Sequence, residues 1–123
     1  MSQLDWLQKK KHFEWMEKCL KCWAICEKCI SESITTGQFL SCCNSCRDCA
    51  EMCSTCIKFE AQQSEFFGQL CEVMANICYA CAEECEKYAD HSVTCQECAD
   101  ACHELSEASR EAAMKFADKR VNE

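Results

Sequence analysis

The sequence predicts an all-α protein, an antiparallel up-down-up-down four-helix bundle with a cysteine-lined core. The 123 residues include no proline and only two glycines, so few positions oppose helix formation. Four segments carry cysteines at alternating steps of three and four, the spacing of one face of an α-helix. The connections between these segments are short, which makes consecutive helices antiparallel neighbours in a single domain spanning residues 1–123.

The first helix is expected over residues 3–33. One face carries cysteines, continued toward the N-terminus by a tryptophan and a histidine: His12, Trp15, Cys19, Cys22, Cys26 and Cys29. Gly37 should break this helix. Thr35 and Gln38 have the spacing of a capping box for the helix that follows.

The second helix is expected over residues 37–62. Its stripe follows steps of four, three, four and three through Cys42, Cys46, Cys49, Cys53 and Cys56. At about 1.5 Å per residue, this row of sulfur atoms is roughly 20 Å long. A turn is predicted at residues 62–64, with Ser64 as a candidate helix cap.

The third helix is expected to end at about Ala89, and the fourth to follow a turn at residues 90–92. The third carries Phe67, Cys71, Met74, Cys78, Cys81, Cys85 and Tyr88 on one face. The fourth carries Cys95, Cys98, Cys102, Leu105, Ser109 and Ala112. Residues 1–10 and 118–123 are expected to fray.

Reflecting the helices through their turns predicts which residues share a level. Three levels contain only cysteine: Cys29/Cys42/Cys85/Cys95, Cys26/Cys46/Cys81/Cys98 and Cys22/Cys49/Cys78/Cys102. The next levels are Cys19/Cys53/Met74/Leu105, then Trp15/Cys56/Cys71/Ser109, then His12 with Phe67 and Ala112. Four independent cysteine rows that close in one register are a specific signal.

Charge and hydropathy exclude several classes of function. The net charge of −8 argues against binding to nucleic acid or to an anionic membrane. The N-terminal residues have no uninterrupted apolar run, so no secretory signal is expected, and no segment is long enough to span a membrane. We therefore expect a cytoplasmic protein whose thiols are reduced.

Metal binding is the strongest interpretation of the 17 cysteines. Three thiol-only levels would leave a poorly filled core if cysteine served only for packing. A reducing compartment opposes disulfides, and thiol–disulfide catalysis needs an accessible pair of low pKa. The sequence also offers no catalytic triad, phosphate loop or acid–base pair, so no enzyme is expected.

Charge balance favours Cu(I) over other thiophilic metals. A Zn²⁺ ion with four thiolates keeps a charge of about −2, which is costly to bury repeatedly. Cu(I) is soft and monovalent, so thiolates that bridge two ions give a nearly neutral core with many ions per chain. Iron–sulfur clusters need room for inorganic sulfide. A zinc or iron–sulfur carrier and a thiol-based redox protein stay as alternatives.

The sequence resembles the four-helix-bundle copper storage proteins, especially their cytosolic branch. The resemblance covers about residues 19–102, through CLKCWAICEKC, CCNSCRDCAEMCSTC, CEVMANICYACAEEC and CQECADAC. It implies reversible storage of many Cu(I) ions by core thiolates, commonly in homotetramers, with copper loaded at one end. A copper chaperone or small thiol carrier would be the donor. Met74 stands where a cysteine step is expected, and Leu105 and Ser109 end the fourth row early.

The candidate ligands are the cysteines and one histidine: Cys19, Cys22, Cys26, Cys29, Cys42, Cys43, Cys46, Cys49, Cys53, Cys56, Cys71, Cys78, Cys81, Cys85, Cys95, Cys98, Cys102 and His91. His91 is either a ligand at the loading end or a solvated turn residue. Cys43 is a flanking ligand or a half-buried thiol, with a ligand favoured. Met74 is filler or a weak thioether ligand, with filler slightly favoured. His12 is expected to plug the far end, and His103 to lie on the surface.

Overall fold

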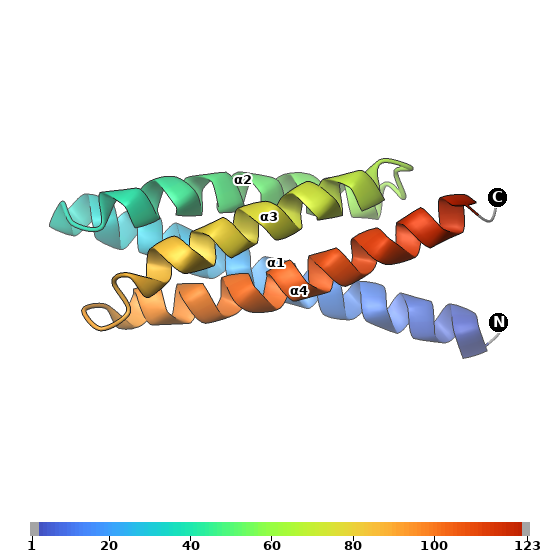
Figure 1. The fold of residues 1–123 in the computed structure, drawn as a ribbon, viewed down its shortest axis with the longest axis horizontal. Helices are drawn as coiled ribbons and strands as arrows, with labels where there is room; N and C mark the ends of the chain where they lie inside the picture. Colours follow the sequence, from blue (N-terminus) through green and yellow to red (C-terminus); the bar gives the residue numbers. More distant parts are fainter. Residues whose placement is uncertain (1–2, 122–123) are drawn as a thin grey trace.

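The computed structural model describes residues 3–121, and side chains from residue 9 to residue 115. It contains four α-helices and, within that range, no strand (Figure 1). They are α1 (Gln3–Thr36), α2 (Leu40–Ala61), α3 (Phe67–Glu86) and α4 (Val93–Val121). The predicted all-α four-helix bundle is confirmed. No helix among the described residues combines the length and apolar character needed to cross a membrane.

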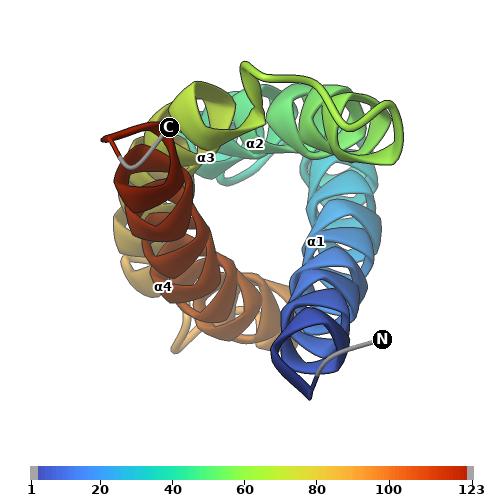
Figure 2. The ribbon, with the colours of Figure 1, turned by 90° about the vertical axis from the view of Figure 1, so that its right-hand side faces the viewer.

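The helices surround one central axis in the order of the chain. The α1–α2 and α3–α4 turns lie at one end of the bundle, and both termini lie at the other (Figure 1). The view along the axis shows the four helices as a closed ring (Figure 2). Each helix packs against two neighbours, since α1 contacts α2 and α4, and α3 contacts the same pair. This is the up-down-up-down order that short turns require.

The first turn differs from its prediction. Helix α1 continues three residues past its expected end to Thr36, and Gly37 then adopts φ +69°, where its N–H donates to the Ser33 carbonyl at 2.9 Å. The predicted capping box is wrong, because the N-cap of α2 is Phe39, which has φ 61° and makes no side-chain cap. The short reversal is closed by backbone geometry, and Gly37 tolerates it since it has no Cβ.

The other two turns are longer than predicted. Residues 62–66 separate α2 from α3, and the Ser64 hydroxyl accepts from the Phe66 N–H at 3.1 Å instead of capping α3. Helix α3 ends at Glu86, before the predicted end at residue 89. Ser92 was not identified as a cap in the sequence. Its hydroxyl accepts from the Cys95 N–H at 3.2 Å, which fixes the start of α4.

Helix α1 is described from Gln3 and α4 as far as Val121, so their outer ends are not tested. Fraying of these ends stays a prediction, and residues 1–2 and 122–123 lie outside the described residues. Helices α3 and α4 also bury small side chains, Ala75, Ala82 and Ala99. The Ser106 hydroxyl of α4 donates to the Ala75 carbonyl at 2.9 Å, which fixes the relative height of these two helices.

Candidate metal centre

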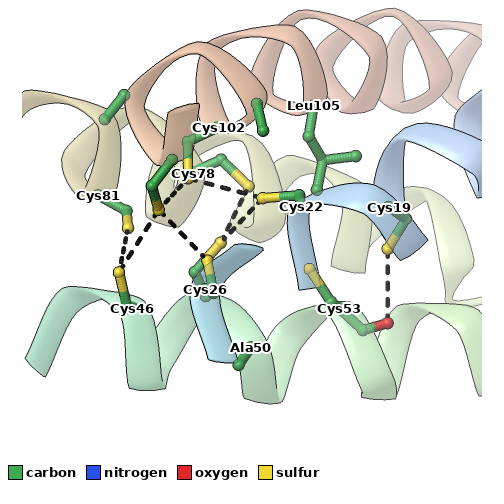
Figure 3. Close-up of a cluster of buried hydrophobic side chains, with 14 of the residues drawn as sticks. Cys19, Cys22, Cys26, Cys46, Ala50, Cys53, Cys78, Cys81, Cys102 and Leu105 are labelled. Carbon is green, nitrogen blue, oxygen red and sulfur yellow. Dashed lines mark hydrogen bonds between the residues drawn. The ribbon is translucent and has the colours of Figure 1, made fainter. Parts of the chain in front are cut away.

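All 17 cysteines are free thiols with buried side chains, none more than 4% exposed. The periodic stripe of each helix faces the axis, because the steps of three and four keep its residues on one side. The core of the bundle is therefore a column of sulfur atoms supported by few large apolar side chains (Figure 3).

The first layer, defined as Cys29, Cys42, Cys85 and Cys95, lies at the end that holds the α1–α2 and α3–α4 turns. We call this end the first-layer end. The Cys42 Sγ atom is 3.4 Å from the Cys29 Sγ atom and 2.9 Å from the Cys85 Sγ atom. Cys95 is 1% exposed in the first turn of α4. Three of the four helices are thus joined by direct sulfur contacts at this level.

The second and third layers repeat the pattern. In the second layer, the Sγ contacts are Cys46–Cys81 at 3.7 Å, Cys46–Cys98 at 3.6 Å and Cys26–Cys98 at 3.8 Å. In the third, the Sγ contacts are Cys22–Cys49 at 3.7 Å, Cys22–Cys102 at 3.6 Å and Cys49–Cys78 at 3.6 Å. These pairs are those that the predicted register places level with one another.

The sulfur atoms are also close between layers. Cys46 Sγ lies 4.0 Å from Cys42 Sγ and 3.9 Å from Cys85 Sγ, and Cys98 Sγ lies 3.9 Å from Cys102 Sγ. Four groups of four thiols have all their Sγ atoms within 4.8 Å of one another: Cys22/Cys26/Cys49/Cys102, Cys26/Cys81/Cys98/Cys102, Cys29/Cys42/Cys46/Cys85 and Cys46/Cys81/Cys85/Cys98. Each group takes three thiols from one layer and one from the next.

The column changes character below the third layer. Met74 and Leu105 are fully buried at the level of Cys19 and Cys53, as predicted. There the Cys19 thiol contacts the backbone carbonyl of Cys53 at 3.6 Å (Figure 3), and one level lower the Cys56 thiol contacts the Leu70 carbonyl at 3.9 Å. At this end Cys19 and Cys56 therefore contact backbone carbonyl oxygens, whereas thiols of the three layers contact other sulfur atoms.

Aromatic side chains fill the far end of the core. The Trp15 indole N–H donates to the Ser109 hydroxyl at 3.0 Å, and the Trp15 ring meets the Phe67 ring edge-on at 5.0 Å between centroids. His12 lies beside Phe67, with 6.3 Å between ring centroids, and its Nδ1 atom is 3.2 Å from a Glu60 carboxylate oxygen. This agrees with the predicted plug of Trp15, Phe67 and His12.

Burial favours the protonated form of Cys56, Cys71 and Cys95 when no metal is bound. It raises the pKa of Cys56 to about 12, and it also raises the pKa of Cys71 and of Cys95, because a thiolate loses its hydration inside the core. A soft cation that displaces the proton supplies the missing charge compensation. The core is therefore suited to thiophilic cations and poorly suited to free thiolates.

Two candidate ligands belong neither to the three layers nor to the lower levels of the column. Cys43 is 4% exposed, so it is more buried than the half-buried thiol considered from sequence, but it belongs to none of the four groups. His91 is exposed in the α3–α4 turn, where its backbone N–H donates to the Tyr88 carbonyl at 3.0 Å. His103 is on the surface as predicted, paired with Glu86 across α3 and α4 at 2.5 Å.

The sequence pattern did not identify the hydrogen bonds between polar side chains at the first-layer end of the bundle. The Ser92 hydroxyl donates to the Glu32 carboxylate at 3.0 Å, which ties the end of α1 to the start of α4. The Ser41 and Tyr88 hydroxyls are 2.8 Å apart, which ties α2 to the end of α3. A serine immediately before a helix is a recognisable cap signal, but its second contact with Glu32 needs the fold.

The comparisons with known proteins agree with this core. The sequence profile described as copper storage protein matches residues 8–114. The chain belongs to the copper storage protein family. The resemblance stated from the sequence is confirmed, and with it the prediction of copper storage by a cysteine-lined bundle. None of the curated proteins searched matches this chain.

Solved structures of copper storage proteins share the fold. A Cu(I)-bound copper storage protein, BsCsp3, is 29% identical, with a TM-score of 0.79 over 84% of this chain and 98% of that one. Apo-Csp3 from Bacillus subtilis is 31% identical, with a TM-score of 0.73 over 80% and 95% of the two chains. A cytosolic copper storage protein from Streptomyces lividans with five coppers is 23% identical and has a TM-score of 0.81 over 88% and 96%, which shows the shared fold.

Proposed function

We propose that this chain stores many Cu(I) ions on the thiolates of its core, in the cytoplasm and without catalysing a reaction. The observation that carries the proposal is the continuous array of buried sulfur atoms through the first three layers, with Sγ contacts of 2.9–4.0 Å. The family membership and the Cu(I)-bound relative support Cu(I) as the stored ion.

The spacing of the array suits bridged two-coordinate copper. With metal–sulfur bonds of about 2.3 Å, the value for zinc used here as a scale, an ion between two thiolates holds them up to roughly 4.6 Å apart. The Sγ contacts of 2.9–4.0 Å in the three layers lie within this range. Because the groups combine neighbouring layers, an ion can join thiolates of one layer or of two. Each thiolate that bridges two ions balances about one positive charge, so the filled core is close to neutral.

The proposed ligands are all 17 cysteines, with His91 as a ligand during loading. The twelve thiols of the three layers have the strongest geometric support. Cys19, Cys53, Cys56 and Cys71 at the lower levels, and Cys43 beside the column, are proposed as ligands on their burial and residue type. Met74 is fully buried and serves as filler in this proposal, although its thioether is a possible weak ligand.

Loading and assembly complete the proposal. A copper chaperone or a small thiol carrier delivers the ions, because exchange between thiolates avoids free Cu(I). The chain assembles as a homotetramer, as its resemblance to the family implies. The acidic surface, with a net charge of −8, opposes nucleic acid and anionic membranes as partners.

Anaerobic titration of the reduced protein with Cu(I), against a chromophoric Cu(I) chelator, tests the function. Bridged thiolates predict saturation on the order of 17 ions per chain, one for each cysteine. Saturation near four ions would indicate separate four-thiolate sites and contradict the bridged array. A parallel Zn²⁺ titration is the control, and a brown protein isolated from cells would instead indicate an iron–sulfur carrier.

A further inference from the structure

One polar side chain at the first-layer end is buried without a hydrogen-bond partner. Within the part of the chain whose side chains are described, the Ser33 hydroxyl is the buried side-chain oxygen or nitrogen that makes no hydrogen bond. The residue is 0% exposed. An unpaired hydroxyl in a protein interior is costly and rare, so it needs a physical explanation.

Ser33 continues the cysteine stripe of α1. It stands four residues after Cys29, so the two side chains lie on the same face of the helix, one turn apart. The backbone carbonyl of Ser33 is already engaged by the Gly37 N–H at 2.9 Å, which fixes this last turn of α1. Ser33 therefore lies one helical turn beyond Cys29, toward the α1–α2 turn.

The neighbouring polar groups at this end are satisfied by one another. The Ser92 hydroxyl donates to Glu32 at 3.0 Å, and the Ser41 and Tyr88 hydroxyls pair at 2.8 Å. In the first layer, the Cys29 thiol pairs with the Cys42 thiol at 3.4 Å. Each of these groups thus has a partner, whereas the Ser33 hydroxyl makes no hydrogen bond.

We propose that Ser33 is a positioning residue for copper in the first layer, with its hydroxyl donating a hydrogen bond to the copper-bound thiolate of Cys29. Metal binding replaces the thiol proton with a cation and turns the sulfur into an anionic acceptor, which takes a stronger hydrogen bond than a neutral thiol. A hydrogen-bond donor beside a metal ligand fixes the orientation of that ligand and strengthens its binding to the metal. This inference rests on the proposed copper storage function.

The test compares Ser33→Ala and Ser33→Thr with Ser106→Ala. Ser106 is a matched control, because it is also a buried helical serine, but its hydroxyl donates to Ala75 at 2.9 Å between α3 and α4, away from the column. The melting temperature of each variant is measured metal-free and fully loaded. Copper release to excess chelator is then followed by absorbance under anaerobic conditions.

We expect Ser33→Ala to leave the metal-free melting temperature unchanged or higher, since it removes an unpaired polar group. The same variant should speed the first phase of copper release by roughly tenfold, the factor that corresponds to about 1.4 kcal/mol. Ser33→Thr should return the release rate to that of the unmutated protein, because threonine keeps the hydroxyl. Ser106→Ala should lower both melting temperatures and leave the release rate unchanged.

Several results would overturn the inference. A lower metal-free melting temperature for Ser33→Ala, or its failure to fold, would mean that the hydroxyl has a structural partner such as a buried water. Equal rates of copper release in Ser33→Ala and Ser106→Ala would show that the Ser33 hydroxyl does not help to hold copper. The proposed function is judged separately, because its failure would appear as an absence of multiple Cu(I) binding by the unmutated protein.

Discussion

The Sγ atom of Cys42 on α2 lies 2.9 Å from the Sγ atom of Cys85 on α3. Cys46, one turn further along α2, approaches both of them, at 4.0 Å and 3.9 Å. It also contacts Cys81 and Cys98 in its own layer, at 3.7 Å and 3.6 Å. Cys46 therefore connects the first layer to the second, and it belongs to two of the four thiol groups.

Replacing Cys46 by serine should weaken copper binding more than replacing Cys43. A hydroxyl is a poor ligand for Cu(I), and the change at Cys46 removes a thiolate from two groups at once. We expect Cys46→Ser to lower the saturating number of ions by at least one and to reduce the affinity of the neighbouring ions. Equilibrium competition with a Cu(I) chelator measures both quantities.

Cys43→Ser is the matched control, since Cys43 is buried in the same helix but belongs to none of the four groups. As a peripheral ligand, Cys43 should account for no more than one ion, with little effect on the others. If the two variants lost copper equally, the layered groups would not be the units that hold the ions.

His91→Ala should slow the loading of copper and leave the capacity nearly unchanged. His91 is exposed in the turn beside the first layer, whose cysteines are themselves covered. An imidazole there can receive an ion from a donor and pass it to the buried thiols, while the storage ligands stay in place. Stopped-flow absorbance at the Cu(I)–thiolate band measures the rate, and His103→Ala serves as a surface histidine control.

Trp15→Ala should lower the free energy of unfolding and have less effect on the rate of copper loading than His91→Ala. Trp15 is 4% exposed, it donates to Ser109 at 3.0 Å, and it packs on Phe67 at the far end. Truncating a buried tryptophan costs ~3–5 kcal/mol of unfolding free energy, measured by chemical denaturation. If Trp15→Ala loaded copper faster and His91→Ala loaded it at the unmutated rate, copper would enter at the end that holds Trp15.

The stability of the metal-free protein should fall as the pH rises above about 8.5, the ordinary pKa of a cysteine thiol. Burial raises the pKa of Cys56 to about 12 and raises the pKa of Cys71 and Cys95. Between the unfolded and folded pKa values the folded state holds more protons, so the free energy of unfolding decreases with pH.

Melting temperatures between pH 7 and pH 10, measured by circular dichroism under reducing conditions, test this dependence. The copper-loaded protein is the internal comparison. Its thiols have already exchanged protons for metal, so its melting temperature should vary less over this range. A metal-free melting temperature that stays flat above pH 8.5 would show that the buried thiols ionise normally.

Removing copper should leave the helices intact but lower the melting temperature strongly. Protonated thiols are apolar enough to occupy the core, and Trp15, Phe67, Met74 and Leu105 add larger buried side chains. Ions that bind only the folded state stabilise it by mass action. A disordered circular dichroism spectrum without metal would mean instead that folding depends on copper, as in small zinc domains.

The cysteine periodicity by itself determined the four helices, their antiparallel order and the register that places Cys22 level with Cys49 and Cys102. A stripe with steps of three and four must face the axis of a bundle, and short turns fix the relative heights of consecutive helices. The same reasoning placed Trp15 beside Ser109, which the 3.0 Å hydrogen bond confirms. The cysteine side chains then indicated that such a core binds thiophilic metal ions.

Only the tertiary structure decided how the thiols group and how the side chains at the first-layer end pair with one another. Sequence register arranges Cys29, Cys42 and Cys85 in one flat layer, but the helices rise continuously, so Cys46 of the next layer joins them within 4.8 Å. The pairing of Ser92 with Glu32 joins residues 60 positions apart, and no local pattern encodes it. Whether the Ser33 hydroxyl finds a partner likewise depends on how the ends of all four helices meet.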